Sequence, residues 1–363
     1  MVDLKGQYLS LKQEIDQAVL DVLANCHYIL GPNVQALEKE TAHYLNAKHT
    51  VTCANGTDAL HLALLAAGIG AGDEVITTPF TFIATAEAIC YVGATPVFVD
   101  IEADTFNISV NAIAKAITKK TKAILPVHLF GQPANLAEIQ KLADAHKLLV
   151  IEDCAQSFGA SINKQQTGSF GALGCFSFFP SKNLGGFGDG GLISTNDDHY
   201  AERLLQLRNH GSKVRYYHDI IGYNSRLDEI QAAILRVKLK HIDSYNQNRR
   251  RVAQQYTQQL NDLPLRAPIE DGIGVHIYHQ YTTLLNDANK RADVMQHLTQ
   301  QGIACAVYYP VPLHQQKAFA QAGYGALPIT EDVTSRCLSL PIFPEMTDAQ
   351  IQIVCQALKD ALA

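Results

Sequence analysis

The sequence predicts an α/β protein with a large, mostly parallel-sheet domain followed by a smaller α+β domain. Apolar segments rich in Val, Ile and Leu alternate with helical segments over roughly the first 235 residues, as is typical of a largely parallel sheet covered on both faces. The rest contains two further strand-like segments between helices, and 363 residues are enough for two domains. We therefore expect a large domain over 1–235 and a small domain over 236–363, with packing of the N-terminal helix on the small domain left open.

The predicted elements of the large domain follow in chain order. A first helix is predicted because one helical face carries Leu11, Ile15, Ala18 and Val22. Two predicted strands, TVTCA and EVITTP, each lead into a predicted helix, ALHLALLAAG and IATAEAICYVG, and three further apolar strands are TPVFVDI, KAILPVHLFG and LLVIEDCA. A long helix is expected to begin near Ser225, where Ser225 and Asp228 resemble a capping pair. This helix should carry the chain out of the large domain.

The C-terminal part predicts a mixture of short strands and helices. HIYHQYTTLL and IACAVYY are the strand-like segments, and between them a helix is expected from about Arg291 to Gln301, with Gly302 at its end. The last helix is predicted to begin at Thr347, where Gln350 completes a T-x-x-Q capping box. This mixture is the reason for predicting an α+β domain.

Composition excludes several classes of protein. The net charge is −6 and no basic stripe is present, whereas a nucleic-acid-binding domain usually carries one. No apolar run is long enough to span a bilayer, and the N-terminus lacks the charged-then-apolar pattern of a signal peptide. The eight cysteines are scattered without a C-x-x-C pair, which favours reduced thiols over disulfides or metal ligands. We expect a cytoplasmic protein without a metal, nucleic-acid partner or membrane partner.

One lysine stands out in the stretch FSFFPSKNLGGFGDGG. Between Lys164 and Asp189 the only charged residue is Lys182, which follows aromatic residues and precedes glycines. Burial disfavours the charged form of a lysine and so lowers its pKa, and a neutral amine is a nucleophile towards aldehydes. The alternative is that Lys182 reaches solvent with its charged end.

Two further motifs offer complementary chemistry. ANGTDAL lies between a strand and a helix, so Gly56, Thr57 and the free N–H groups of the helix N-terminus could hold a phosphate; an ordinary helix cap is the alternative. GIGAGD follows a helix and precedes a strand, the reverse of a dinucleotide loop, and is interpreted as a turn. IEDCAQSFGA ends a strand with Glu152 and Asp153, one of which should point into a ligand site; a solvated acidic pair at the strand end is the alternative. A phosphate cradle, a carboxylate and a poised lysine together match pyridoxal 5'-phosphate.

The order of the motifs extends this inference. NGTDAL, PFTFIATAEA, VHLFGQPA, IEDCAQSFGA, FSFFPSKNLGGFGDGG, RNHG and GYNSRLDEIQAAIL follow one another along the chain. In this order they resemble the sugar-nucleotide aminotransferases of the DegT/DnrJ/EryC1/StrS family, and the resemblance covers essentially the whole chain. It implies the aspartate-aminotransferase fold, fold type I, and a homodimer with active sites shared at the subunit interface.

The resemblance also implies roles for individual residues. Lys182 would hold the cofactor as a Schiff base, Asp153 would pair with the ring nitrogen, Gln156 would lie near the ring hydroxyl, and Phe82 would stack on the ring. The phosphate would be bound by Gly56, Thr57 and Ser177, with Asn224 from the partner subunit. The sugar nucleotide would be contacted by Tyr308, Tyr309, His314 and Arg226, the last from the partner subunit. A carboxylate at sugar C6 needs a cation, which Arg226 or Arg215 could supply.

The implied reaction has two halves. L-glutamate would leave its amine on the cofactor, giving pyridoxamine 5'-phosphate and 2-oxoglutarate, and a nucleotide-linked keto-sugar would then accept the amine. Related dehydratases carry histidine at the Lys182 position, so lysine argues for amino transfer. The motifs look most like enzymes acting on UDP-2-acetamido-2-deoxy-3-oxo-glucuronate for bacterial surface polysaccharide such as the O-antigen of lipopolysaccharide. The alternatives are a dTDP-3-oxo- or 4-oxo-6-deoxyhexose as substrate, a fold-type-I lyase or aldolase, and a regulator without catalysis.

Overall fold

A seven-stranded sheet forms the centre of the molecule. The computed structural model describes residues 1–363, with the side chains of residues 321 and 322 excepted. The sheet order is β1-β9-β8-β5-β4-β2-β3. Its strands are β1 (His49–Cys53), β2 (Glu74–Thr77), β3 (Thr95–Phe98), β4 (Thr121–Leu125), β5 (Leu149–Asp153), β8 (Leu173–Ser177) and β9 (Gly191–Thr195). Strand β9 runs antiparallel to both neighbours and the remaining adjacent pairs are parallel, which confirms the predicted mostly parallel sheet.

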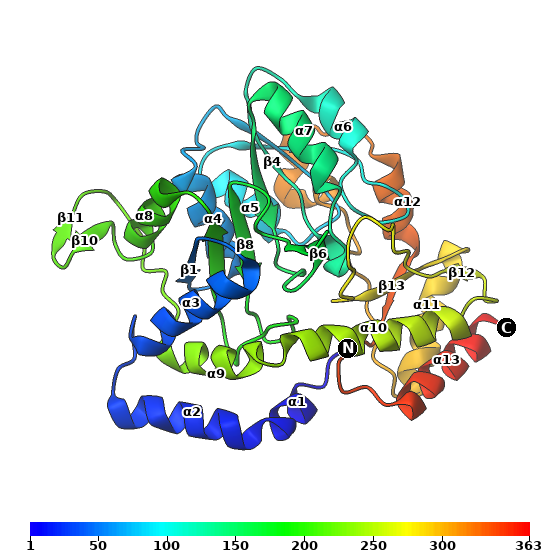
Figure 1. Ribbon diagram of the computed structural model, residues 1–363. Helices are drawn as coiled ribbons and strands as arrows, with labels where there is room; N and C mark the ends of the chain where they lie inside the picture. The colour runs from blue at the N-terminus through cyan, green and yellow to red at the C-terminus, as the bar shows by residue number, and fades with distance from the viewer.

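Helices cover both faces of this sheet (Figure 1). They are α3 (Pro32–Leu45), α4 (Gly56–Ala66), α5 (Ala84–Tyr91), α6 (Val110–Ala116), α7 (Leu136–His146) and α8 (Asp198–Leu207). Helices α4, α5 and α8 pack on one face, where Ile151 is buried. Helices α6 and α7 pack on the other face, with Val150, and α3 packs there with Phe176. Successive strand residues point to opposite faces, so the near-continuous apolar strands of the sequence follow from burial on both sides.

Two helices lead away from the sheet towards the C-terminal elements (Figure 1). They are α9 (Glu229–Leu239) and α10 (Ile242–Gln259). The prediction that the first of these helices, α9, begins near Ser225 and is capped by it is wrong. Asp228 is the N-cap of α9, and its Oδ1 accepts from the Gln231 N–H at 2.8 Å. Ser225 Oγ instead donates to Asp58 Oδ2 at 2.5 Å and accepts from the Ala54 N–H at 3.2 Å. The domain boundary at residue 235 falls inside α9 and stays a prediction.

A three-stranded antiparallel sheet organises the C-terminal part. Its strands are β12 (Leu265–Arg266), β13 (Tyr281–Leu285) and β14 (Cys337–Leu340), and its helices are α11 (Arg291–Gln300), α12 (Pro328–Arg336) and α13 (Asp348–Leu362). The predicted capping box at Thr347 and Gln350 is confirmed. The strand predicted at IACAVYY is wrong, because Ala306 alone pairs with Ser339 and the chain then turns towards the cavity described below.

The remaining elements lie around these two sheets. They are α1 (Leu4–Ser10), α2 (Lys12–Asn25), β6 (Ser161–Ile162), β7 (Gln165–Gln166), β10 (Ser212–Val214), β11 (Tyr217–His218), η1 (Leu129–Gly131), η2 (Ala288–Lys290), η3 (Leu313–Gln315) and η4 (Lys317–Ala322). The predicted first helix is α2, and its Ile15 packs with Ile234 and Val237 of α9. The hairpin β10–β11 projects from the body at the left of Figure 1.

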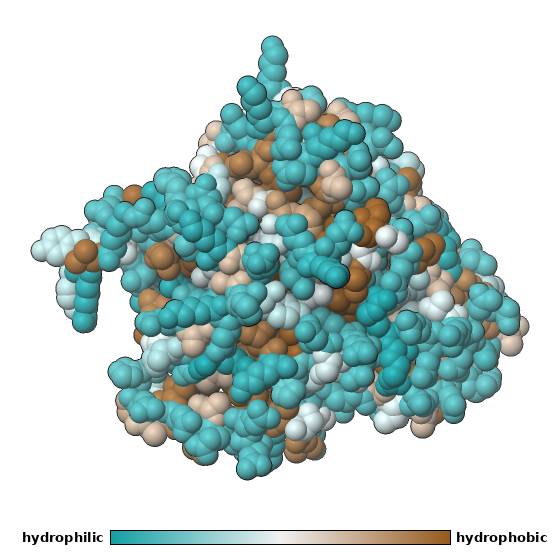
Figure 2. All heavy atoms as spheres, in the orientation of Figure 1, coloured by the Kyte–Doolittle hydropathy of each residue, from teal (hydrophilic) through white to brown (hydrophobic). Residues whose placement is uncertain are grey.

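The surface is mostly hydrophilic in the view of Figure 2, with apolar residues between polar ones over the N-terminal helices. All eight cysteines are free, and those that are buried are Cys53, Cys154, Cys175, Cys337 and Cys355. Within the described part of the chain, the helices lack the combination of length and apolar character that crossing a membrane requires.

Candidate active site

A cavity of about 680 Å³ opens where the parallel strands end. Strands β1, β2, β4, β5 and β8 point the same way, so their carboxyl ends meet at one edge, where ligands collect in such sheets. The structure brings nine of the predicted site residues to this cavity: Gly56, Thr57, Phe82, Asp153, Gln156, Ser177, Lys182, Tyr308 and Tyr309. The cavity is therefore the candidate active site.

The N-terminus of α4 forms an anion cradle on one wall. Asn55 caps this helix, since its Oδ1 accepts from the Asp58 N–H at 2.8 Å. The N–H groups of Gly56 and Thr57 belong to the first turn, where no partner exists within the helix. A Cβ on Gly56 would lie 2.6 Å from Cβ of Ser177, so only glycine lets the Ser177 hydroxyl approach. Free N–H groups and a hydroxyl at a helix N-terminus suit a phosphate.

Asp153 supplies a carboxylate at the end of β5. It is 4 % exposed, and its Oδ2 accepts from the Thr85 hydroxyl at 2.8 Å while its Oδ1 accepts from the Ala155 N–H at 3.1 Å. Burial raises the pKa of Asp153, against the opposing effects of these donors and of Lys182. The hydrogen bonds hold the carboxylate rigidly towards the cavity.

Glu152 points to the other side of the strand and is fully buried. Its two oxygens accept from the N–H groups of Gly168 at 2.7 Å, Phe170 at 2.9 Å and Gly171 at 2.8 Å. His128 is the fourth donor: its Nδ1 accepts from the Ala134 N–H, so its Nε2 carries the proton that reaches Glu152 at 3.0 Å. His128, Glu152 and Cys154 lie close enough together to suggest a metal site. Because the carboxylate oxygens and both imidazole nitrogens are already bonded, we interpret the group as a structural hydrogen-bond cluster.

Changing Glu152 to glutamine should destabilise the fold. The new amide NH₂ would face backbone N–H donors, which leaves buried groups unpaired at a cost of about 3 kcal/mol. Urea unfolding should therefore show a lower free energy of unfolding for E152Q. The matched control is E138Q on α7, where the side chain is 55 % exposed and a change below about 0.5 kcal/mol is expected. Equal stability of E152Q and the unchanged protein would contradict the structural role.

Lys182 lies in a turn after β8. Its N–H donates to the carbonyl of Phe179 at 2.8 Å, and its side chain lines the cavity. Burial lowers the pKa of Lys182 from 10.5 to about 8, and the negative charge of Asp153 opposes the shift. A larger fraction of this amine than of an ordinary lysine is therefore neutral near physiological pH, and the neutral form can act as a nucleophile or a base.

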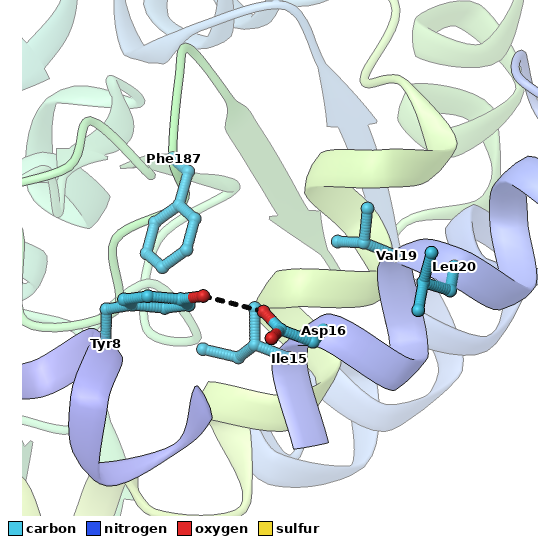
Figure 3. Close-up of a pocket in the computed structure, with 6 residues that line it drawn as sticks. All are labelled: Tyr8, Ile15, Asp16, Val19, Leu20 and Phe187. Carbon is cyan, nitrogen blue, oxygen red and sulfur yellow. Dashed lines mark hydrogen bonds between the residues drawn. The ribbon is translucent and has the colours of Figure 1, made fainter. Parts of the chain in front are cut away.

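The glycine-rich loop after Lys182 is held from two sides. Phe187 meets the ring of Tyr8 from α1 edge to face, with ring centroids 5.9 Å apart, beside an apolar groove (Figure 3). From α9, the buried Lys238 donates from Nζ to the Gly185 carbonyl at 2.6 Å, and Gln231 Oε1 accepts from the Phe187 N–H at 2.7 Å. These contacts fix the loop that directly follows Lys182.

Aromatic and amide groups form another part of the wall. Gln156 Oε1 accepts from the Phe130 N–H at 2.7 Å, and its Nε2 donates to the Tyr309 hydroxyl at 3.0 Å. Burial raises the pKa of Tyr309, so this hydroxyl stays neutral. Phe82 is 57 % exposed at the cavity surface, where a planar ligand could stack on it.

Four predicted site residues lie away from this cavity in the same chain. Asn224 is exposed and pairs through its backbone with Asn209, whose side chain accepts from Arg226 Nη1 at 3.0 Å. Arg215 lies in the hairpin turn, 4.9 Å above the ring of Tyr216. The structure does not bring His314 to the described cavity wall, and its Nε2 lies 3.0 Å from Glu331 Oε1. The predicted roles of these four residues stay predictions.

Several lining residues were not singled out from the sequence. They include Asn55, Thr85, Phe130, Asp189, His279 and Gln280. Asn55 could have been found as the cap in ANGTDAL, and Thr85 as a hydroxyl within PFTFIATAEA. His279 and Gln280 reach the site from about a hundred residues beyond Lys182, and no local pattern connects them to it.

The groups that meet in this cavity define a class of enzyme. The lysine suits the aldehyde of pyridoxal 5'-phosphate, the buried carboxylate suits its ring nitrogen, and the cradle suits its phosphate. The protein is a pyridoxal-phosphate-dependent transaminase of fold type I, so the fold class and cofactor predicted from the sequence are confirmed.

The chain belongs to the DegT/DnrJ/EryC1/StrS aminotransferase family, which it matches over residues 9–359. It is 50 % identical to the UDP-N-acetyl-3-dehydro-α-D-glucosamine 3-aminotransferase of Acidithiobacillus ferrooxidans, covering 100 % of this chain and 97 % of the relative. It is 42 % identical to the UDP-2-acetamido-2-deoxy-3-oxo-D-glucuronate aminotransferase of Pseudomonas aeruginosa, covering 98 % of each. The crystal structure of DesV from S. venezuelae in complex with a ketimine intermediate superposes with a TM-score of 0.96 at 41 % identity, covering 100 % of this chain and 98 % of that one. The protein is thus a sugar aminotransferase.

Proposed function

We propose that the protein transfers the amino group of L-glutamate to the C3 ketone of a UDP-linked 2-acetamido-2-deoxy-3-oxo sugar. The observation that carries this proposal is that the relatives from A. ferrooxidans and P. aeruginosa, aligned over nearly the whole chain, are both named for such 3-oxo substrates. The product would serve bacterial surface polysaccharide or lipopolysaccharide synthesis in the cytoplasm.

The first candidate substrate is the uncharged sugar of UDP-N-acetyl-3-oxo-glucosamine, for which the A. ferrooxidans relative is named. The 3-oxo-glucuronate expected from the motifs becomes the second candidate. Among the described residues that line the cavity, Lys182 is the only lysine or arginine, whereas Asp58, Glu87, Asp153 and Asp189 are acidic. A carboxylate at C6 would find no second cation within one chain, so binding the uronate needs Arg215 or the partner's Arg226. The second candidate is favoured by the 42 % identical P. aeruginosa relative.

The chain's own residues divide the work as follows. Pyridoxal 5'-phosphate supplies the aldehyde that takes up the amine and the ring that accepts electrons. Asp153 would keep the ring nitrogen protonated, and one pKa unit of this preference is worth about 1.4 kcal/mol. Lys182 would carry a proton between the two carbons beside the transferred nitrogen, because it is tethered nearby and has a pKa of about 8. Phe82 would cover the ring and exclude water.

A second copy of the chain would complete the site. The α4 N-terminus offers N–H groups to the cofactor phosphate, but the acidic side chains of the wall leave a nucleotide diphosphate without a cation unless positive charge arrives from outside. The segment around the projecting hairpin carries Lys213, Arg215 and Arg226, and it also exposes Tyr216 by 78 % and Ile221 by 91 %. Exposed apolar side chains beside cations fit an interface with an acidic cavity, which supports a homodimer with shared sites.

Changing Asn224 to alanine should weaken cofactor binding in the dimer. Losing one hydrogen bond to a charged phosphate corresponds to roughly 10- to 100-fold in affinity, measured by cofactor release followed by absorbance. The matched control is N261A, at an exposed position before β12. A monomer that holds the cofactor as tightly as the unchanged protein would rule out the shared site.

Incubation with L-glutamate tests the reaction class. Conversion of the bound cofactor to its pyridoxamine form with equimolar 2-oxoglutarate is expected. Absence of 2-oxoglutarate would rule out L-glutamate as the amino donor. The converted enzyme should then aminate UDP-N-acetyl-3-oxo-glucosamine faster than the 3-oxo-glucuronate, and both faster than dTDP-3-oxo- or 4-oxo-6-deoxyhexoses. Faster turnover of the 3-oxo-glucuronate would make it the first candidate substrate in place of the glucosamine. Faster turnover of a deoxyhexose would overturn the proposed substrate.

A further inference from the structure

A buried chain of polar side chains runs beneath the reactive lysine. Asn246 Nδ2 of α10 donates to the Phe158 carbonyl at 3.0 Å, and Asn183 Nδ2 donates to Asn246 Oδ1 at 2.7 Å. Asn183 Oδ1 lies 3.0 Å from His279 Nδ1. Asn183 is 5 %, Asn246 5 % and His279 4 % exposed. The chain therefore links the residue directly after Lys182 to a histidine on the cavity wall.

The order of hydrogen-bond donors along these linked side chains fixes the tautomer of His279. The Phe158 carbonyl only accepts, so Asn246 presents its NH₂ there and its oxygen to Asn183. Asn183 then uses its own NH₂ towards Asn246, which leaves its Oδ1 to accept from His279. The proton of the neutral imidazole must consequently lie on Nδ1, and Nε2 carries a lone pair.

The surroundings keep this imidazole neutral. Burial lowers the pKa of His279 well below 6.5, and the nearby charges of Lys182 and Arg249 add to the effect. Asp153 is the acidic group near Lys182 on the same cavity wall. A neutral ring with a fixed lone pair is a hydrogen-bond acceptor that keeps the same orientation throughout turnover.

Two polar groups in this cavity are without partners among the described residues. Lys182 Nζ makes no hydrogen bond, and His279 Nε2 makes none either, although both side chains line the same cavity. We propose that His279 is a positioning residue for Lys182, its Nε2 accepting a hydrogen bond from Nζ whenever that amine is not joined to the cofactor. The proposal goes beyond the transaminase assignment, since nothing in that reaction requires an acceptor at this position.

This role predicts a change in the pKa of Lys182 itself. A neutral acceptor stabilises the ammonium more than the amine, so its loss should lower the pKa of Lys182 by about one unit. The measurement is competitive acetylation with acetic anhydride as a function of pH, on enzyme converted to its pyridoxamine form, with Lys182 quantified by peptide mass spectrometry. The unchanged enzyme should show a midpoint near 8, the value to which burial lowers this amine.

Four variants separate positioning from packing. H279F removes the acceptor, and H279N keeps a donor for Asn183 but is too short to reach Lys182, so both should lower the midpoint. H279Q offers an NH₂ to Asn183 and an oxygen to Lys182 and should restore it to within about 0.3 unit. The control H276Q alters a buried histidine that stacks on Tyr278 at 3.9 Å outside this cavity and should leave the midpoint unchanged. An unchanged or raised midpoint in H279N, whether or not H279F folds, would overturn the proposal.

Discussion

Replacing Lys182 with alanine is expected to abolish amino transfer, with a loss of at least about 10⁴-fold, because the variant lacks both the nucleophile and the proton carrier. The half-reaction with L-glutamate, followed by 2-oxoglutarate release, measures this loss directly. After borohydride treatment with added cofactor, the unchanged protein should carry a covalent adduct on Lys182, whereas K182A should carry none there by mass spectrometry.

Two companion variants define what the loss means. K182R keeps a cation in the cavity but removes a titratable amine, so it should be as inactive as K182A if the amine itself is needed. K141A, on α7, changes a lysine that is 79 % exposed and should keep the full rate. Full turnover by K182A would remove Lys182 from the chemistry.

The pH dependence of cofactor capture gives the same residue an independent test. Only the neutral amine attacks an aldehyde, and burial lowers the pKa of Lys182 to about 8. The rate of cofactor capture should therefore rise with pH up to about 8 and level off above it. A rise that continues to the ordinary lysine value of 10.5 would mean that the amine is solvated.

Replacing Asp153 with asparagine should be the second most damaging change, with a loss of roughly 10²- to 10⁴-fold in turnover. An amide cannot provide the negative charge that keeps a ring nitrogen protonated, and its NH₂ would point at the Thr85 hydroxyl or the Ala155 N–H, which now donate to the carboxylate. Aspartate and asparagine side chains differ little in size, so the packing around position 153 should be preserved. The absorbance of the bound cofactor should change together with the rate.

A surface carboxylate provides the matched control for this change. Asp144 on α7 accepts from Gln140 at 2.7 Å on an exposed face, and D144N should leave both rate and absorbance unaltered. If D153N also kept its rate and spectrum, the ring nitrogen would not depend on Asp153, and the electron-accepting role would have to be reassigned.

The sequence predicts this site well where chemistry and topology coincide. Gly56 and Lys182 follow β1 and β8, and Asp153 ends β5. These strands point the same way, so the meeting of the three residues at a common edge follows from the apolar pattern. His279 comes from the segment before β13, and its approach depends on how α10 and the C-terminal sheet fold back, which no local pattern encodes. Long-range packing of this kind also explains why Ser225 binds Asp58 instead of capping α9.

The fold prediction failed at one strand for a related reason. A short continuous run of apolar residues such as IACAVYY is typical of a buried strand, yet Ala306 alone pairs with Ser339. Tyr308 and Tyr309 then line the cavity, so this part of the segment borders the cavity instead of continuing a sheet. Aromatic residues at a binding site and aromatic residues in a strand look alike in a single sequence.

The two neighbouring carboxylates at the end of β5 should make this strand intolerant of insertions and deletions. Glu152 points towards the buried hydrogen-bond cluster and Asp153 points towards the active-site cavity. A one-residue shift along β5 would therefore exchange the sides to which the two carboxylates point. Relatives can tolerate substitutions elsewhere along the strand. A one-residue insertion or deletion just before these carboxylates would remove both the buried hydrogen bonds of Glu152 and the cavity position of Asp153. Length changes in this family should therefore accumulate in the connections and spare this strand.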